Sequence, residues 1–239
     1  MRPSHLAVLA LLALPGACAP RGGALVPATD AAGAGIDPYE SCRVTDPGPA
    51  DDPTRCLREV EARLLAEAAG RARRSGSRLE LRAADTLIAE FADQSGEGEE
   101  FVRYRYGGWL PRVAQHVVQV DLYEGAGVVA VDGRTGRIAE LLGRPEVSPD
   151  GGRVAAANVD LVAAYTESGL QVWRVTPEGL ELEWALDGGG RWGGSAPRWL
   201  GADRLTFTFH TLDPSTMELR GRPATLELHG DGFTVRLGR

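Results

Sequence analysis

The chain has 239 residues, with 33 acidic and 26 Lys or Arg side chains and a formal net charge of −7. It contains no lysine at all, which excludes Schiff-base catalysis and the lysine contact to phosphate of a P-loop. The acidic balance argues against a nucleic-acid-binding surface, because such a surface needs a basic stripe along one face.

The first residues carry a signal for export. Arg2 supplies a basic start, and Leu6–Leu14 is an apolar run that is too short to cross a bilayer. Small residues follow the run, as they do before a signal-peptidase cleavage site. Residues 1–17 are therefore predicted to be a signal peptide that directs the chain out of the cytoplasm.

Two cleavage sites compete after the apolar run. The segment that ends at Cys18 resembles a bacterial lipobox, with Pro15 where those sequences usually have leucine, and the resemblance implies that Cys18 carries lipid. Cleavage after Ala19 is the alternative, and it would leave Pro20 as an unfavourable first residue. We favour lipidation, so we expect a periplasmic or outer-membrane lipoprotein that contacts the membrane through its lipid anchor alone.

A tether and a disulfide are expected next. Residues 18–38 are rich in proline, alanine and glycine and nearly lack large apolar side chains, so this stretch is predicted to be flexible. Cys42 and Cys56 stand 14 positions apart around a loop rich in proline and aspartate. In an oxidising compartment the two thiols are expected to pair. A metal pair is the alternative, but no further Cys or His stands at ligand spacing, so we expect no metal ion.

One helix is predicted, with Asp52 as its N-cap, Pro53 as its first residue and its end near Arg74. The arginines between positions 71 and 74 would then lie at the helix C-terminus, where cations complement the helix dipole. Residues 39–76 are thus expected to form a disulfide-stapled loop and helix. The apolar residues that recur along this helix at steps of three and four are Leu57, Val60, Leu64, Leu65 and Ala68.

From residue 77 to 239 the pattern changes to short strands and turns. Turns rich in glycine, proline and aspartate recur about every 8 to 12 residues, and the runs between them are apolar or alternate in polarity. This spacing is typical of an antiparallel β domain. The strand-forming runs in the later part of the domain are Val117–Leu122, Val128–Val131, Val154–Ala157, Leu161–Tyr165, Leu170–Val175, Leu180–Trp184, Leu205–Phe209, Ala224–Leu228 and Phe233–Leu237.

Two stretches of this domain look alike. Pro145 opens the first stretch, and Pro197, 52 positions later, opens the second. Each continues into an apolar strand and then a hairpin, and Val128–Val131 with the turn Asp132–Gly136 looks like a third copy of that hairpin. A repeat in this length range is typical of propeller blades.

The first copy carries a family resemblance. Its Pro-x-x-Ser-Pro-Asp-Gly segment resembles the blade repeat of bacterial periplasmic β-propellers, a group that includes the Tol-system propeller protein; Val147 stands where that family usually has tryptophan. The resemblance implies blade-like antiparallel meanders. We therefore expect a mainly β fold, a partial or small propeller-like arrangement, preceded by one short α-helix. A β-sandwich is the alternative.

No catalytic residue is predicted. Gly193–Pro197 contains a serine but lacks the last glycine of the Gly-x-Ser-x-Gly nucleophile motif, so we interpret it as a glycine loop. His116, His210 and His229 are too far apart in sequence to form a local metal motif, and we interpret them as surface or hydrogen-bonded histidines. We therefore favour a protein that is not an enzyme and needs no cofactor.

A binding contact is predicted late in the chain. Four of the five tryptophans lie between Trp173 and Trp199, where packing of strands would explain most of them. Trp192 is different because it follows Arg191 in a run of glycines, and the two residue types are typical of contact hot spots. Arg191 and Trp192 are therefore the candidate binding residues, and packing of Trp192 in the core is the alternative.

Together these observations favour an exported bacterial envelope protein with a non-catalytic binding or scaffolding role. The expected partner is a protein or a glycan of the envelope, and nucleic acid is not expected. One alternative is a hydrolase that acts on envelope peptides or glycans through a site without a recognisable motif. Another is a purely structural lipoprotein. A binding module would expose an apolar patch, whereas an enzyme would bring titratable groups together.

Overall fold

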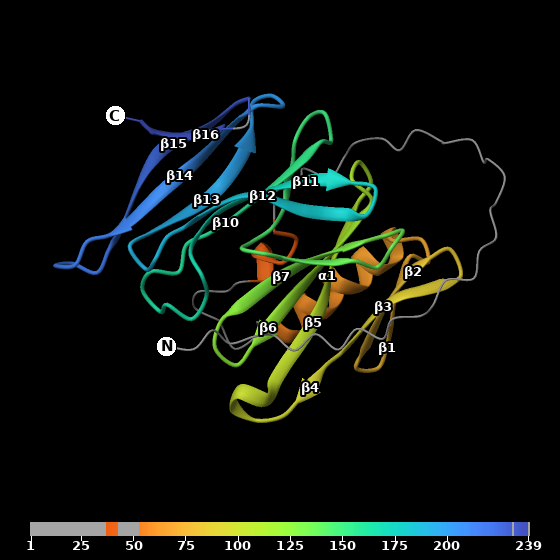
Figure 1. The fold of residues 1–239 in the computed structure, drawn as a ribbon. Helices are drawn as coiled ribbons and strands as arrows, with labels where there is room; N and C mark the ends of the chain where they lie inside the picture. The colour runs from red at the N-terminus through yellow and green to blue at the C-terminus, as the bar shows by residue number, and fades with distance from the viewer. Residues whose placement is uncertain (1–36, 43–52, 231, 239) are drawn as a thin grey trace.

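The structure is a computed structural model that describes residues 37–42, 53–230 and 232–238. The predicted signal peptide, Cys18, most of the predicted tether and the predicted N-cap Asp52 lie outside these residues. The described part is mainly β, with four antiparallel sheets and one α-helix before them, so the predicted fold class is confirmed (Figure 1). Within these residues no helix combines the length and the apolar character needed to span a membrane.

The elements follow one another simply along the chain. A 3₁₀ turn η1 (Glu40–Cys42) and the helix α1 (Pro53–Glu67) come first. The first sheet contains β1 (Ala72–Ser75), β2 (Arg78–Ala83) and β3 (Thr86–Ala92). The second contains β4 (Gln94–Ser95), β5 (Phe101–Leu110), β6 (Gln115–Leu122), β7 (Ala126–Asp132) and β8 (Ile138–Leu141), with the 3₁₀ turn η2 (Gly98–Glu100) before β5. The third contains β9 (Glu146–Val147), β10 (Arg153–Asn158), β11 (Gly169–Thr176) and β12 (Gly179–Asp187). The fourth contains β13 (Trp192–Trp199), β14 (Arg204–Leu212), β15 (Leu219–His229) and β16 (Gly232–Leu237).

Every sheet is a meander, because strands that are neighbours in a sheet are also neighbours in the chain. The two copies of the 52-residue repeat occupy equivalent places in this arrangement. Val147 of the first copy lies in β9, the first strand of the third sheet, and Trp199 of the second copy lies in β13, the first strand of the fourth. The repeat in the sequence is therefore a repeat of four-stranded units.

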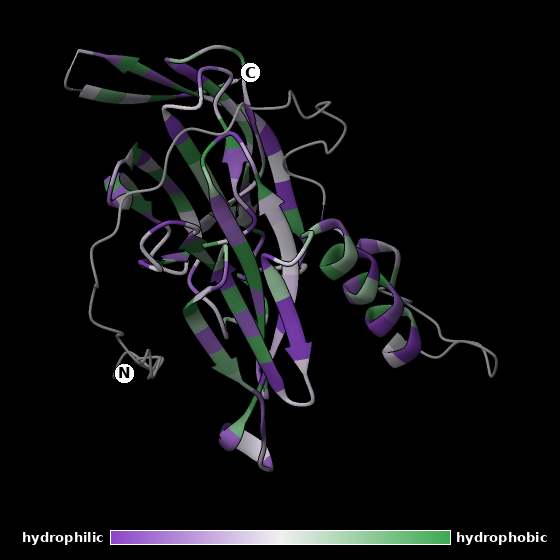
Figure 2. Cartoon of the chain, turned by 90° about the vertical axis from the view of Figure 1, so that its right-hand side faces the viewer, coloured by the Kyte–Doolittle hydropathy of each residue, from purple (hydrophilic) through white to green (hydrophobic). Residues whose placement is uncertain are grey.

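The sheets pack face to face in chain order, with a hydrophobic core between each consecutive pair. The first core joins Leu79 of the first sheet to Val118 of the second, and the second core joins Leu141 to Val154 of the third sheet. The third core joins the third and fourth sheets, and the stacked rings of Trp184 and Phe233, 5.3 Å apart, extend this contact. Figure 2 shows the alternating hydrophobic and hydrophilic bands along the strands that this packing requires.

The two faces of the fourth sheet differ in chemistry. Leu205, Phe207 and Leu226 point into the third core and are buried. Thr206 and Thr208, whose side chains point the other way along β14, are only half-buried. A polar outer face is typical of the last unit of a stacked array. The four described sheets thus form an open row, in which no hydrophobic core joins the fourth sheet back to the first.

The prediction that the helix continues to Arg74 is wrong. The helix ends at Glu67, and the next turn contains Ala69 and Gly70 with φ values of 50° and 85°. Two consecutive residues in the left-handed region stop a helix, and glycine adopts that region at little cost. Arg73 and Arg74 therefore lie in β1 and do not cap the helix.

Two other predictions also need correction. The apolar run Leu161–Tyr165, predicted as a strand, lies in the irregular connection between β10 and β11. Gly193–Pro197, predicted as a loop, lies inside β13. A Cβ atom at Gly193 would collide with Asn158 and Val159, at 2.7 to 2.8 Å, and one at Gly194 would lie only 3.1 Å from the backbone oxygen of Gly169. In β13 tertiary packing decides the outcome against the local composition.

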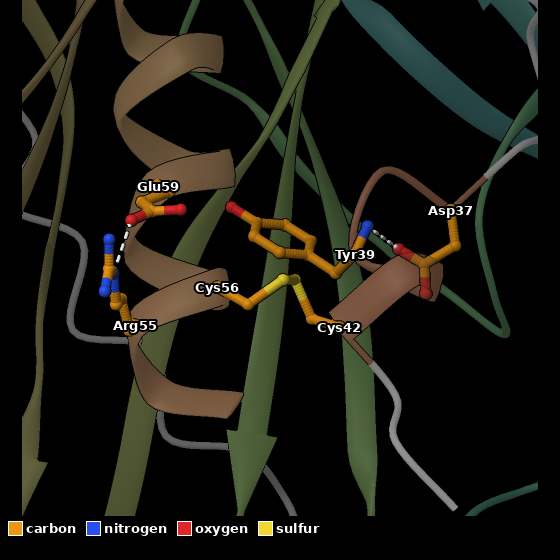
Figure 3. Close-up of a disulfide and its surroundings, with 6 residues drawn as sticks. All are labelled: Asp37, Tyr39, Cys42, Arg55, Cys56 and Glu59. Carbon is orange, nitrogen blue, oxygen red and sulfur yellow. Dashed lines mark hydrogen bonds and ion pairs between the residues drawn. A yellow bond between two sulfur atoms is a disulfide. The ribbon is translucent and has the colours of Figure 1, made fainter. Parts of the chain in front are cut away.

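Cys42 and Cys56 form a disulfide that joins η1 to the first turn of α1 (Figure 3). Tyr39 lies beside it, almost fully buried, and its hydroxyl donates to the backbone oxygen of Tyr106 on β5 at 2.7 Å. A cross-link that closes a loop of this length contributes about 3 kcal/mol in the chain-entropy description. The disulfide therefore holds η1 and the helix against the second sheet.

Candidate binding surface

Three turns meet at one end of the molecule: one in the second sheet, one in the third sheet, and the one that joins the third sheet to the fourth. A Cβ atom at Gly125, in the β6–β7 turn, would lie 3.2 Å from the Cβ atom of Tyr165 in the β10–β11 connection. The β12–β13 turn reaches the same connection, because the backbone N–H of Gly188 donates to the backbone oxygen of Ser168 at 2.8 Å. We call this surface the loop end and define it as residues 123–125, 159–168 and 188–192.

The loop end carries exposed apolar side chains from two of its turns. Tyr123 is 62% exposed, Val162 58% and Tyr165 56%. Single exposed apolar residues are common on protein surfaces, but a group of them at one place is typical of a contact surface. Tyrosine is suited to such a place, because its ring offers a large apolar area and its hydroxyl can hydrogen-bond.

Asp160 organises the connection that holds two of these side chains. Its carboxylate accepts hydrogen bonds from the backbone N–H groups of Ala164, Tyr165 and Thr166 at 2.8 to 3.0 Å and from the Thr166 hydroxyl at 3.1 Å. Burial alone would raise the pKa of Asp160, but these hydrogen bonds outweigh it and hold the pKa below its ordinary value. The carboxylate is thus ionised at neutral pH and fixes the backbone on either side of Tyr165.

Asn158, the chain's sole asparagine, adds a second support to this connection. Its Nδ2 donates to the Thr166 hydroxyl at 2.9 Å and to the backbone oxygen of Glu167 at 2.7 Å. Ala164, just before Tyr165, has a φ of 56°, which is strained for a residue other than glycine. The loop thus keeps a strained conformation that leaves Tyr165 and Val162 in solvent.

The predicted binding residues lie at this same end but in different surroundings. Trp192 begins β13 and is half-buried; its ring stacks on Phe209 of β14, with centroids 4.8 Å apart and an interplanar angle of 5°. The guanidinium of Arg222 lies over the Phe209 ring, 5.3 Å from the centroid of that ring. Arg191 is exposed in the turn. Packing therefore accounts for much of Trp192, and the contact role of both residues stays a prediction.

Other charged residues gather in a cavity of about 200 Å³ between α1 and the strands β1 and β5. Its side chains include Arg74, whose guanidinium pairs with Glu61 at 2.7 Å and with Asp93 at 3.3 Å. These charges satisfy one another, so we interpret the cavity as part of the scaffold. The described residues contain no group of three or more His, Cys, Asp or Glu side chains that would hold a metal ion.

The exposed residues of the loop end were missed in the sequence because the run Leu161–Tyr165 has the composition of a strand. A usable signal was present on either side of it. Asp160 comes before the run and Thr166 directly after it, and both residue types hydrogen-bond nearby backbone in irregular segments. An aspartate and a threonine on either side of a short apolar run therefore indicate a loop more than a strand.

Comparisons with known proteins add little. No protein-family model matches the sequence, and no curated protein matches it either. Among solved structures, a protein assigned as TolB from Agrobacterium tumefaciens is similar at 14% identity and a TM-score of 0.26, over 70% of this chain and 75% of that chain. A TM-score of this size carries no argument about function.

Proposed function

We propose that the chain is an exported envelope protein that binds a protein or glycan partner through the loop end. One observation carries the proposal: Tyr165 and Val162 are held in solvent by a loop whose backbone Asp160 and Asn158 fix by hydrogen bonds. An aromatic anchor that is already positioned loses little conformational entropy when it binds. A scaffold with no partner has no need to expose these side chains on a strained loop.

Export and anchoring belong to the same proposal. They are supported by the pattern of residues 1–17, by the lipobox-like segment before Cys18, and by a disulfide of the kind that persists in oxidising compartments. We expect the mature chain to begin at Cys18 with acyl chains attached. Intact-mass analysis of the protein from bacterial membranes checks this, and a mature chain that begins at Pro20 without lipid would contradict it.

Site-specific photo-crosslinking tests the binding surface directly. A photoreactive residue at position 165 is expected to capture one defined partner in intact cells. Leu200 offers a matched control, because it is 60% exposed but follows β13 at the opposite end of the strand from Trp192. Equal capture from both positions, or none from position 165, would favour the purely structural alternative.

The captured partner then allows the contact to be measured. Tyr165→Ala is expected to weaken binding at least about tenfold, which is about 1.4 kcal/mol, since truncation of a central aromatic anchor commonly costs this much or more. The melting temperature should stay unchanged, because the side chain is mostly in solvent. Leu200→Ala should change neither quantity.

A further inference from the structure

The outer face of the fourth sheet carries a serine and a histidine in hydrogen-bond contact. Ser195 on β13 pairs in register with Thr208 of β14, and His210 lies two residues further along β14. The Ser195 Oγ and His210 Nε2 atoms are 2.7 Å apart. Both side chains lie on the face opposite Trp192 and Phe209, so this pair is separate from the loop end and goes beyond the proposed function.

The imidazole of His210 packs against the backbone of a glycine. Gly221 on β15 lies directly opposite His210 in the register. A Cβ atom at Gly221 would lie 3.1 Å from the Cε1 atom and 3.2 Å from the Nδ1 atom of His210, so the ring lies against bare backbone. Nδ1 is buried there and has no hydrogen-bond partner among the described residues. The ring therefore has one ordered contact to a polar side chain, the Ser195 hydroxyl.

The protonation state suits a base. Burial lowers the pKa of His210, so the ring is neutral at pH 7. In the tautomer with its proton on Nδ1, the Nε2 atom accepts the hydrogen bond of the Ser195 hydroxyl. This is the relation between nucleophile and general base in serine-dependent acyl transfer.

The backbone beside Ser195 is irregular and open. The ladder pairs Ser195 with Thr208 and then Arg198 with Thr206, so it skips two residues between them. The first of these, Ala196, has a φ of 49°, in the left-handed region that favours glycine. Nucleophilic serines commonly sit at sharp, strained turns that present Oγ to the substrate. Ser195 itself is half-exposed on this face.

We propose that Ser195 is a nucleophile toward small activated acyl esters and that His210 is its base. The Ser195 oxygen attacks the ester carbonyl carbon while its proton passes to Nε2 of His210; the bond from that carbon to the alkoxy oxygen breaks, and the alcohol leaves with the proton. Water, deprotonated by Nε2, then attacks the acyl carbon; the acyl–serine bond breaks, the proton on Nε2 returns to the Ser195 oxygen, and the carboxylic acid is released.

Turnover is expected to be slow. Among the described residues no carboxylate orients Nδ1 of His210, and loss of that partner costs serine hydrolases about 10⁴-fold in rate. Covalent labelling is therefore a better readout than hydrolysis. We expect a fluorophosphonate probe to add once to the disulfide-bonded protein, at Ser195 by peptide mapping, and p-nitrophenyl acetate to acylate the same residue.

Four variants test the proposal. Ser195→Ala should abolish the adduct, and His210→Gln should slow labelling at least about 100-fold, the size of a general-base contribution. Thr208→Ala removes a neighbouring hydroxyl from the same face and should label at the normal rate. Gly221→Ala should also slow labelling, because its methyl group displaces the imidazole.

Thermal unfolding establishes that each variant is folded before it is labelled. The proposal is overturned if the folded wild-type chain gives no adduct, if the adduct maps to another residue, or if folded His210→Gln labels as fast as the wild type. Unchanged partner capture at position 165 in the Ser195→Ala variant would further show that the two surfaces act independently.

Discussion

Replacing Glu61 with alanine is expected to lower the free energy of unfolding by about 3 to 5 kcal/mol, the usual cost of removing one partner from a buried ion pair. Glu61 is 8% exposed on the inner side of α1. Its carboxylate accepts from the Arg74 guanidinium at 2.7 and 3.0 Å and from the backbone N–H of Tyr106 at 2.9 Å. The substitution therefore leaves a largely buried cation whose one remaining carboxylate partner among the described residues is Asp93, and it removes the acceptor of a backbone N–H.

Urea unfolding at pH 7 measures this effect, and the same helix supplies the control. Glu59 is exposed and pairs with Arg55 at 2.8 Å, so Glu59→Ala should cost no more than about 0.5 kcal/mol (Figure 3). Glu61→Gln keeps the side-chain volume and a neutral hydrogen-bond acceptor, so we expect an intermediate loss. If Glu61→Ala and Glu59→Ala lose the same small amount, Glu61 does not join the helix to the sheets.

This ion pair also explains why the end of the helix could not be predicted. Both Glu61 and Arg74 look like surface residues in the sequence, and the apolar stripe of the helix is complete without them. Arg74 reaches Glu61 only because the chain turns back at Ala69 and Gly70 and places β1 beside the helix. Gly70 is the local signal for that turn, and it lies four residues before the predicted end near Arg74.

The meanders, by contrast, could be predicted because their information is local. Each hairpin is specified by its own turn residues and by the alternation of the strands on either side, and no distant contact is needed to recognise it. The repeat of 52 residues then placed Val147 and Trp199 in equivalent strands. Short strands without alternation, such as β9, are recognisable only by their partners in the sheet.

The two proposed surfaces were the hardest to predict, because each depends on strands or loops that are distant in sequence. The turns that carry Tyr123 and Tyr165 meet at Gly125, and they do so only through the packing of the second and third sheets. Ser195 and His210 are 15 positions apart, and a one-residue change in the β13–β14 register would put them on opposite faces. Trp192 was found by composition alone, and its stack on Phe209 depends on the same register.

Lowering the pH from 7 to 4 is expected to reduce the free energy of unfolding by about 3 kcal/mol through His116 alone. His116 is fully buried on β6, where its Nδ1 atom lies 3.2 Å from the Tyr106 hydroxyl and its ring lies 4.6 Å from that of Trp109. Burial lowers the pKa of His116 to about 4; the positive charge of Arg71 lowers it further, and the negative charge of Asp132 opposes both. An unfolded chain has a histidine pKa near 6.5.

The direction of the effect follows from proton counting. Between about pH 4 and 6.5 the unfolded chain binds a proton at His116 that the folded chain does not, so stability falls as the pH drops through this window. A pKa difference of about 2.5, at about 1.4 kcal/mol for each pH unit, gives the stated loss. Burial lowers the pKa of His210 as well, and that residue adds a loss in the same direction.

Urea midpoints at pH 7, 6, 5 and 4.5 measure the contribution of His116. His116→Gln should be less stable than the wild type at pH 7, because it replaces a ring packed between Trp109 and Tyr106, but its stability should change far less across this window. If His116→Gln loses as much stability as the wild type between pH 7 and 4.5, His116 is not the group responsible.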